Sequence, residues 1–341
     1  MTHMLSLLPK SRFEESGVEI PGGLAFLADY RPDAIAEAAA GTEGLFMPPS
    51  HPRLDADLLA RLGSVRIIQT AGAGFDSVDH AAAAKLGLIV CNSPAQNAIT
   101  VAEHVIGAVI CLQRELAYAD EAIKSGAYAQ ARERILGRGA CELFGATVGI
   151  VGLKDPGEKV DTERIGRALA PRLAAFGATV VASDVFWPED FAQEHGIRRV
   201  NLDELFAVSD IVTLHCPLMD ATRGLVDAAR LASMKPGAIL INAARGGIVD
   251  ETALAAALER GGIRGAAIDN FESEIPSPGN PLLRLSPEAR RRVLFSPHLA
   301  GVTRAAFARL IRQAIGNLEN SLRGLPPQFS VNGLSSIRPS A

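Results

Sequence analysis

The chain has 341 residues, of which 48% are apolar and 21% are charged, and its net charge is −4. This composition is ordinary for a globular protein of about two domains, and the mixed, weakly acidic charge excludes a basic face for nucleic acids or a polybasic membrane anchor. Because the four cysteines form no C-x-x-C pair and no signal peptide or long apolar run is present, we expect a cytoplasmic protein without disulfides or bound metal.

Short apolar runs alternate with Ala/Leu-rich segments along the N-terminal part of the chain. Three runs predict buried strands, at 44–48, 65–70 and 88–92. Between them, residues 55–62 and 78–86 have helical spacing. Near-continuous apolar strands separated by helices are typical of a parallel sheet that is covered on both faces.

The same alternation returns further along the chain. Apolar runs predict strands at 147–152, 179–184, 211–214, 238–242 and 265–269. These runs are again separated by segments with helical spacing, so we predict a second parallel sheet built from βα units.

Two long helical segments flank this second series. The first begins at Thr100, which forms a capping-box spacing with Glu103, and runs to about residue 123. A polar, glycine-containing segment follows over 125–139. The second long helix covers 303–322. We interpret the two helices as the crossings between one βα domain and another that interrupts it.

The strand over 147–152 leads into an unusual glycine loop. A Rossmann unit needs glycines for a tight turn, for close approach of the pyrophosphate and for contact between helix and strand. The chain has Gly152 and Gly166, but residues 154–163 stand where a compact loop is expected. Which amides hold the pyrophosphate therefore stays open.

An acidic residue, Asp184, ends the next predicted strand. Once the insertion is allowed for, its distance from the glycine loop is near the ~20 residues expected of a ribose-binding acid. A carboxylate there accepts hydrogen bonds from ribose hydroxyls and repels a 2′-phosphate, which favours NAD over NADP. The alternative is that Asp184 caps the following helix. Trp187 could cover the adenine or simply pack.

Taken together, these segments resemble the D-isomer-specific 2-hydroxyacid dehydrogenase family over nearly the whole chain. The matching motifs are Ala71-Gly-Ala-Gly-Phe-Asp-Ser-Val-Asp79, Asn92-Ser-Pro-Ala-Gln-Asn97 with Val101-Ala-Glu-His104, Ser209-Asp-Ile-Val-Thr-Leu-His-Cys-Pro217, Met234-Lys-Pro-Gly-Ala-Ile-Leu-Ile-Asn-Ala-Ala-Arg-Gly-Gly247, Ala267-Ile-Asp-Asn-Phe-Glu-Ser-Glu274 and Ser296-Pro-His-Leu-Ala-Gly301. The resemblance is weakest in the N-terminal segment and in the glycine-loop insertion.

The resemblance implies an α/β fold of two doubly wound parallel-sheet domains. An NAD-binding Rossmann domain, 103–301, is inserted into a flavodoxin-like substrate domain made of 1–102 and 302–341. It also implies the catalytic residues: Arg245, the acid partner Glu274 and the acid/base histidine His298. Glu272 is an alternative to Glu274 by residue type, but the family's spacing favours Glu274.

The implied cofactor and substrate contacts lie in the same motifs. The cofactor residues are Gly152, Ile165, Gly166, Asp184, His215, Cys216, Pro217, Ala243, Ala244, Asp269 and Gly301. The substrate residues are Ala71, Gly72, Ala73 and Gly74, whose amides match the family's carboxylate-binding loop, with Met47 and Pro48. His104 is more typical of a structural or cofactor-adjacent residue than of a catalytic one.

The chemistry explains why these residue types are needed. Reduction of a 2-oxo acid adds hydride to the carbonyl carbon and a proton to its oxygen, and histidine is suited to give that proton near neutral pH. An arginine binds a carboxylate and stabilises negative charge that develops on the carbonyl oxygen. A neighbouring carboxylate, Glu274, fixes the imidazole ring.

The segment Leu45-Phe-Met-Pro-Pro-Ser-His51 offers apolar residues where phosphoglycerate-type members carry arginines. We therefore expect a substrate whose second end is neutral, apolar or very small. The leading hypothesis is an NAD-dependent 2-oxo-acid reductase, and the alternative is an NAD(H)-binding sensor or corepressor-like protein of the same fold. The resemblance also implies a homodimer, with 125–139 as a candidate arm.

Overall fold

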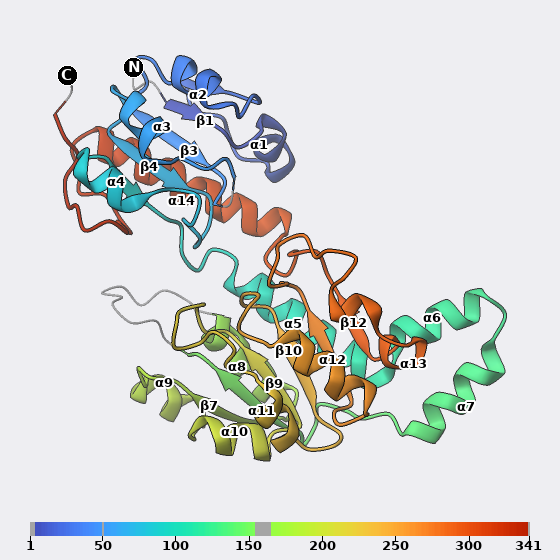
Figure 1. Cartoon of the computed structure of the whole chain (residues 1–341). Coiled ribbons are helices and arrows are strands. Elements are labelled where there is room, and N and C mark those ends of the chain that lie inside the picture. The colour runs from blue at the N-terminus through green and yellow to red at the C-terminus, as the bar shows by residue number, and fades with distance from the viewer. Residues whose placement is uncertain (1–3, 50, 154–164, 340–341) are drawn as a thin grey trace. The chain divides into compact units, whose positions relative to one another are not determined.

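The computed structural model describes residues 4–49, 51–153 and 165–339. The chain forms two compact units, coloured by residue number in Figure 1. Unit 1 contains Met1–Asn97 and Val302–Ala341, and unit 2 contains Ala98–Gly301. The first crossing therefore falls a little before the predicted boundary at 102/103, at the first residue of a helix, and the second falls at 301/302.

Unit 1 is built on a five-stranded parallel sheet in the order β2-β1-β3-β4-β5. The strands are β1 (Met4–Ser6), β2 (Leu24–Phe26), β3 (Gly44–Met47), β4 (Ile67–Thr70) and β5 (Ile89–Cys91). The helices are α1 (Lys10–Ser16), α2 (Pro32–Ala38), α3 (Ala56–Arg61), α4 (His80–Lys85) and α14 (Arg304–Leu322), and α14 packs on β3 and β4. This strand order is that of flavodoxin-like folds.

Unit 2 is built on a seven-stranded parallel sheet in the order β12-β11-β10-β9-β6-β7-β8. The strands are β6 (Thr147–Val151), β7 (Thr179–Ser183), β8 (Arg198–Arg199), β9 (Ile211–Leu214), β10 (Ile239–Asn242), β11 (Gly265–Ile268) and β12 (Val293–Phe295). This is the Rossmann order extended by one strand, and the direction of strand addition reverses between β6 and β9. Ligands of such sheets bind at this switch point, outside the carboxyl ends of the strands.

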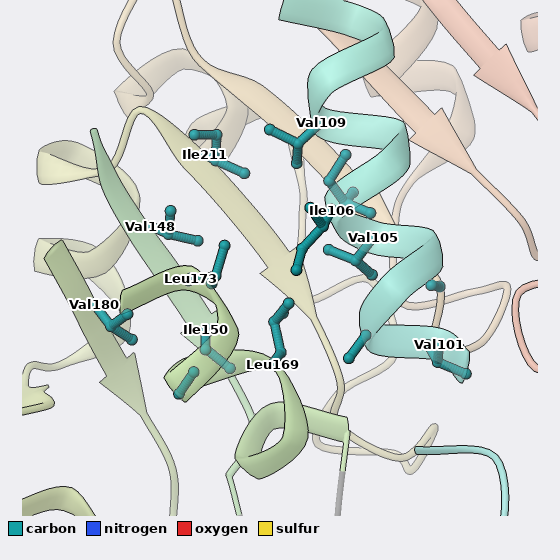
Figure 2. Close-up of a cluster of buried hydrophobic side chains, with 14 of the residues drawn as sticks. Val101, Val105, Ile106, Val109, Val148, Ile150, Leu169, Leu173, Val180 and Ile211 are labelled. Carbon is teal, nitrogen blue, oxygen red and sulfur yellow. The ribbon is translucent and has the colours of Figure 1, made fainter. Parts of the chain in front are cut away.

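Helices cover both faces of this sheet. The helices of this unit are α5 (Ala98–Arg114), α6 (Leu116–Lys124), α7 (Tyr128–Arg138), α8 (Ile165–Ala175), α9 (Glu189–Glu194), α10 (Leu202–Val208), α11 (Ala228–Ser233), α12 (Glu251–Glu259), the 3-10 helix η1 (Pro281–Arg284) and α13 (Pro287–Arg290), of which α6 and α7 lead away from the sheet. Val101, Val105 and Val109 recur every fourth residue, so they lie on one face of α5. Figure 2 shows this face turned toward the apolar side chains of β6, β9 and α8. Burying each such side chain contributes about 1.5–3 kcal/mol.

Two predictions about the first long helix were wrong. The helix α5 begins at Ala98, so Thr100 lies inside it and is not its N-cap. The helix also ends early, because Glu115 adopts a left-handed conformation (φ 50°). The Glu115 carboxylate is buried and pairs with Arg134 Nε and Arg138 Nη1, each at 3.0 Å. These bonds offset the strain of the break, and most of the polar segment forms α7.

The second long helix is as predicted, with Thr303 as its N-cap: its side chain accepts a hydrogen bond from Ala306 N at 3.1 Å. Over the described ranges, no helix combines the length and apolar character needed to cross a bilayer. Nor does any group of three or more His, Cys, Asp or Glu side chains in those ranges have the arrangement of a metal site.

Candidate active site

His298 and Glu274 form a hydrogen-bonded pair in unit 2. His298 Nδ1 lies 2.7 Å from Glu274 Oε1, and both side chains are exposed. Glu274 belongs to the loop after β11, and His298 belongs to the loop after the neighbouring strand β12. A carboxylate on Nδ1 fixes the ring and leaves Nε2 for proton exchange with a ligand. The structure thus brings together two of the three predicted catalytic residues.

The backbone of His298 is strained, and hydrogen bonds between Asp269 and residues 298–300 support it. His298 has φ 54°, a left-handed conformation that costs a non-glycine residue about 1–3 kcal/mol. The buried Asp269 carboxylate accepts hydrogen bonds from Ser296 Oγ at 2.6 Å and from the amides of Leu299 and Ala300 at 2.9 and 3.0 Å. The His298 amide also donates to Asp269 O at 2.9 Å. We call Asp269, Ser296 and the amides of Leu299 and Ala300 the Asp269 clamp.

The clamp gives Asp269 and Ser296 a structural role, support of the His298 loop, that their motifs did not predict. Sequence analysis placed Asp269 beside the cofactor, and that contact stays a prediction. Ser296 was noted only as a neighbour of the histidine. Its signal was available in the sequence, since a hydroxyl directly after a strand can reach an acid at the end of the adjacent strand. His104 Nε2 lies 3.5 Å from Ser296 Oγ, so it borders this cluster.

Arg245 follows β10, the strand next to β11. Its Nη1 donates to Ala244 O at 2.8 Å, and Asn242 Nδ2 donates to Arg245 O at 3.0 Å. Within the described part of the chain it makes no hydrogen bond or ion pair with the other two predicted catalytic residues. A Cβ on Gly246 would lie 1.8 Å from Phe271 O, so only glycine lets the loops after β10 and β11 touch here.

The switch point contains two glycines that a side chain would obstruct. Gly152, at the end of β6, has φ 102°, and a Cβ on it would lie 2.9 Å from the carbonyl of His215. A Cβ on Gly166, in the first turn of α8, would lie 2.3 Å from Gly152 O. The end of β6, the start of α8 and the end of β9 therefore meet at backbone distance, as a dinucleotide site requires. The insertion itself, 154–163, lies outside the described residues.

Asp184 follows β7, and its carboxylate is bound to backbone amides. Oδ2 accepts from Leu153 N at 2.5 Å, and Oδ1 accepts from Phe186 N at 2.9 Å. The alternative role as a helix cap is wrong, because α9 begins at Glu189 with Pro188 as its N-cap. The predicted ribose contact stays a prediction.

Trp187 packs against the core cluster of unit 2 under the guanidinium of Arg199, which lies 5.2 Å from the ring centroid. This supports the packing alternative for Trp187.

His215 directly follows β9 and has a neutral ring. Its Nε2 lies 2.8 Å from Thr213 Oγ1, and its enclosed Nδ1 has no hydrogen-bond partner among the described residues. Burial lowers the pKa of His215 to about 3, so the ring carries no charge at neutral pH.

The remaining predicted cofactor residues lie in the same unit. Cys216 and Pro217 follow β9, Ala243 and Ala244 follow β10, Ile165 opens α8, and Gly301 ends the unit. Most of them thus stand at the carboxyl edge of the sheet, where ligands of such folds bind.

Unit 1 carries the predicted carboxylate-binding loop between β4 and α4. The carbonyls of Gly72, Ala73 and Gly74 accept hydrogen bonds from Ser93 N (2.7 Å), Asn92 Nδ2 (2.9 Å) and Thr70 Oγ1 (2.8 Å). The amides of the same three residues have no acceptor among the described residues. Ala71 is anchored to β3 through its amide, which donates to Met47 O at 2.8 Å. Clustered amides without acceptors suit an anion.

The predicted substrate contact of Met47 needs correction. Met47 is the last residue of β3 and is 0% exposed, as is Phe46, so both side chains belong to the core of unit 1. The first part of the apolar run that suggested a substrate loop, through Met47, belongs to the buried strand β3. Pro48, just beyond the strand, is half-buried.

A two-domain architecture with a Rossmann unit and a histidine–carboxylate pair is typical of dinucleotide-dependent dehydrogenases. Comparison with known proteins agrees. Residues 106–300 match the family described as D-isomer specific 2-hydroxyacid dehydrogenase, NAD binding domain. The chain belongs to the D-isomer specific 2-hydroxyacid dehydrogenase family. The predicted fold, family and cofactor NAD are thereby confirmed.

Curated relatives include D-3-phosphoglycerate dehydrogenase of Archaeoglobus fulgidus, 37% identical over 85% of this chain and 51% of the relative. Glyoxylate reductase of Korarchaeum cryptofilum is 32% identical over 84% of this chain and 82% of the relative. The chain spans about half the length of the phosphoglycerate dehydrogenases that it matches.

Solved structures with the same fold include D-lactate dehydrogenase of Escherichia coli, with TM-score 0.79, 27% identity and coverage of 97% of this chain and 100% of that one. The holo form of D-mandelate dehydrogenase of Rhodotorula graminis has TM-score 0.81 and 23% identity, and covers 99% of each chain. The latter likeness supports the fold alone.

Proposed function

We propose that the protein is an NAD-dependent oxidoreductase that interconverts a 2-oxo acid and a D-2-hydroxy acid. The observation that carries this proposal is the 2.7 Å contact between His298 and Glu274, in the unit that matches the family's NAD binding domain. An imidazole held by a carboxylate is suited to exchange a proton with a substrate oxygen. NAD, when bound, supplies the hydride acceptor or donor.

Separate residues of unit 2 transfer the proton, bind the substrate and bind the cofactor. In the reductive direction, His298 Nε2 donates a proton to the C2 oxygen while Glu274 holds Nδ1. Arg245 binds the substrate and stabilises negative charge on the same oxygen. The tight backbone at Gly152 and Gly166 leaves room for the pyrophosphate, and the carboxylate of Asp184 takes the ribose hydroxyls.

In unit 1, we assign carboxylate binding to the loop Ala71–Gly74. The carbonyls of this loop are tied back, and three of its amides are left without acceptors, as described above. A substrate carboxylate would satisfy these donors, because backbone amides that cluster in a turn form a favourable anion site.

The test is NADH consumption, followed by absorbance, with a panel of 2-oxo acids that runs from glyoxylate to branched and aromatic members. We expect turnover, and we expect the hydroxy-acid product to be the D-isomer. NADH binding without turnover of any 2-oxo acid would refute the proposal and favour a sensor role.

We also infer a homodimer. The predicted arm, 125–139, contains α7, and we extend the arm to include α6, because the two helices pack on each other and lead away from the sheet of unit 2 in Figure 1. The arm exposes several large apolar side chains: Leu116 (50%), Ile123 (51%), Tyr128 (62%) and Leu136 (64%). A surface of this kind on one element is typical of a protein interface. Sedimentation velocity tests it: the wild type should sediment as a dimer and Leu136→Asp should shift toward the monomer. Wild-type protein that stays monomeric would refute it.

A cytoplasmic location stays a prediction.

A further inference from the structure

Unit 2 has a pocket directly beside the His298–Glu274 pair. It lies at the carboxyl ends of β11 and β12 and has a volume of about 240 Å³. Both members of the pair belong to its lining, so a group inside the pocket adjoins the imidazole. For comparison, a cavity of about 150 Å³ is large enough to hold benzene.

The walls of this pocket are mainly apolar. Phe271 and Phe295 stack with their ring centroids 5.7 Å apart, and Leu283 from η1 also lines the space with Pro276 and Pro297. Rings and aliphatic side chains gain most by contact with other apolar groups that leave water. The pocket therefore favours a branched aliphatic or aromatic group.

The charges at the pocket disfavour an anion. Its lining contains the carboxylates of Asp269 and Glu274 and no lysine or arginine. A phosphate or second carboxylate placed here would meet like charge and find no lysine or arginine in the lining to pair with.

We propose that this pocket receives the second end of the substrate and that the substrate is a 2-oxo acid with a branched or aromatic side chain. The inference rests on the proposed function. A C2 oxygen within hydrogen-bond reach of His298 Nε2, about 2.6–3.2 Å, places the rest of a small substrate within a few bonds of the pocket. The site differs from the one expected from sequence, which lay on the segment 45–51 of unit 1, where Met47 is part of the buried strand β3.

The substrates that test this proposal differ only beyond the reacting carbon. Phenylpyruvate carries an aromatic side chain, glyoxylate carries none, and 3-phosphohydroxypyruvate carries a phosphate. We expect the wild type to use phenylpyruvate with a kcat/KM about tenfold or more above that for 3-phosphohydroxypyruvate, the scale of discrimination that a pocket of this kind gives. A preference for the phosphorylated acid would overturn the inference.

The variant Leu283→Trp fills the pocket. We expect the ratio of kcat/KM for phenylpyruvate to kcat/KM for glyoxylate to fall about tenfold or more, because only the first substrate needs the space. The matched control is Leu325→Trp, which adds the same ring at an exposed site of unit 1 and should leave the ratio unchanged. Melting temperatures of both variants near that of the wild type exclude misfolding as the cause.

The outcomes of these experiments distinguish failure of the pocket assignment from failure of the proposed dehydrogenase function. Turnover of glyoxylate with an unchanged ratio in Leu283→Trp would overturn the pocket assignment and leave the dehydrogenase proposal intact. Absence of turnover with every 2-oxo acid would overturn both.

Discussion

Replacing Asp269 by asparagine should lower both the free energy of unfolding of unit 2 and the turnover number of the enzyme. The carboxylate accepts three hydrogen bonds, from Ser296 Oγ, Leu299 N and Ala300 N, and it is only 3% exposed. An amide keeps one acceptor oxygen and turns an NH₂ group toward the other donors. At least one backbone donor then loses its acceptor, and a hydrogen bond to a charged acceptor is worth about 1.5–3 kcal/mol. We expect unit 2 to lose about 3 kcal/mol of unfolding free energy.

The loss should also reach catalysis, because the clamp holds His298 in its left-handed conformation. A conformation that stores about 1–3 kcal/mol relaxes when its support is removed, so the turnover number of Asp269→Asn should fall by about tenfold to a hundredfold. Ser296→Ala removes one of the three bonds and should give a smaller fall in the same direction.

Urea unfolding measures the stability change. Trp187 is the only tryptophan and lies in unit 2, so its fluorescence reports on that unit. The matched control is Asp227→Asn, since Asp227 caps α11 and asparagine caps helices equally well. If Asp269→Asn and this control unfold at the same urea concentration and turn over equally fast, the clamp has no supporting role and the reasoning fails.

Two further predictions concern the cofactor side of unit 2. Gly166→Ala should abolish NADH binding in a fluorescence titration while the far-UV spectrum stays native, because the added Cβ would lie 2.3 Å from Gly152 O; binding as tight as in the wild type would contradict the close approach. The low pKa of His215 makes the unfolded state bind more protons than the folded state between pH 6.5 and about 3, so stability should fall on acidification through this range by about 1.4 kcal/mol per pH unit. In His215→Gln this part of the acid sensitivity should disappear, and an unchanged pH profile of the urea midpoint would contradict the assignment.

The strands that the sequence predicted are those buried on both faces. Runs such as 147–152 and 211–214 are almost wholly apolar because each strand of a doubly wound sheet is covered by helices on both sides. Of the missed strands, β2, β8 and β12 are edge strands, where this demand is weaker, whereas β1 is fully buried but only three residues long. β8 consists of two exposed arginines, and β12 is only half-buried.

The residues of the site were predictable where the reaction requires a particular residue type. They were not predictable where a contact depends on how separate loops of the chain approach one another. Glu274 and His298 followed from motif and function, and their contact was confirmed as a distance although their catalytic roles remain proposals. The amide bonds from Leu299 and Ala300 to Asp269 and the contact of Gly246 with Phe271 depend on how loops after different strands approach one another, which the local sequence does not fix. Met47 was misplaced because a buried strand and an apolar pocket loop have the same composition.

A comparison of His298→Ala with the wild type, for NADH binding and for NADH consumption in the presence of a 2-oxo acid, tests whether His298 exchanges the substrate proton. General acid catalysis contributes about a hundredfold to ten-thousandfold, so the variant should bind NADH as the wild type does and lose turnover by that factor. Turnover retained in His298→Ala would contradict the account.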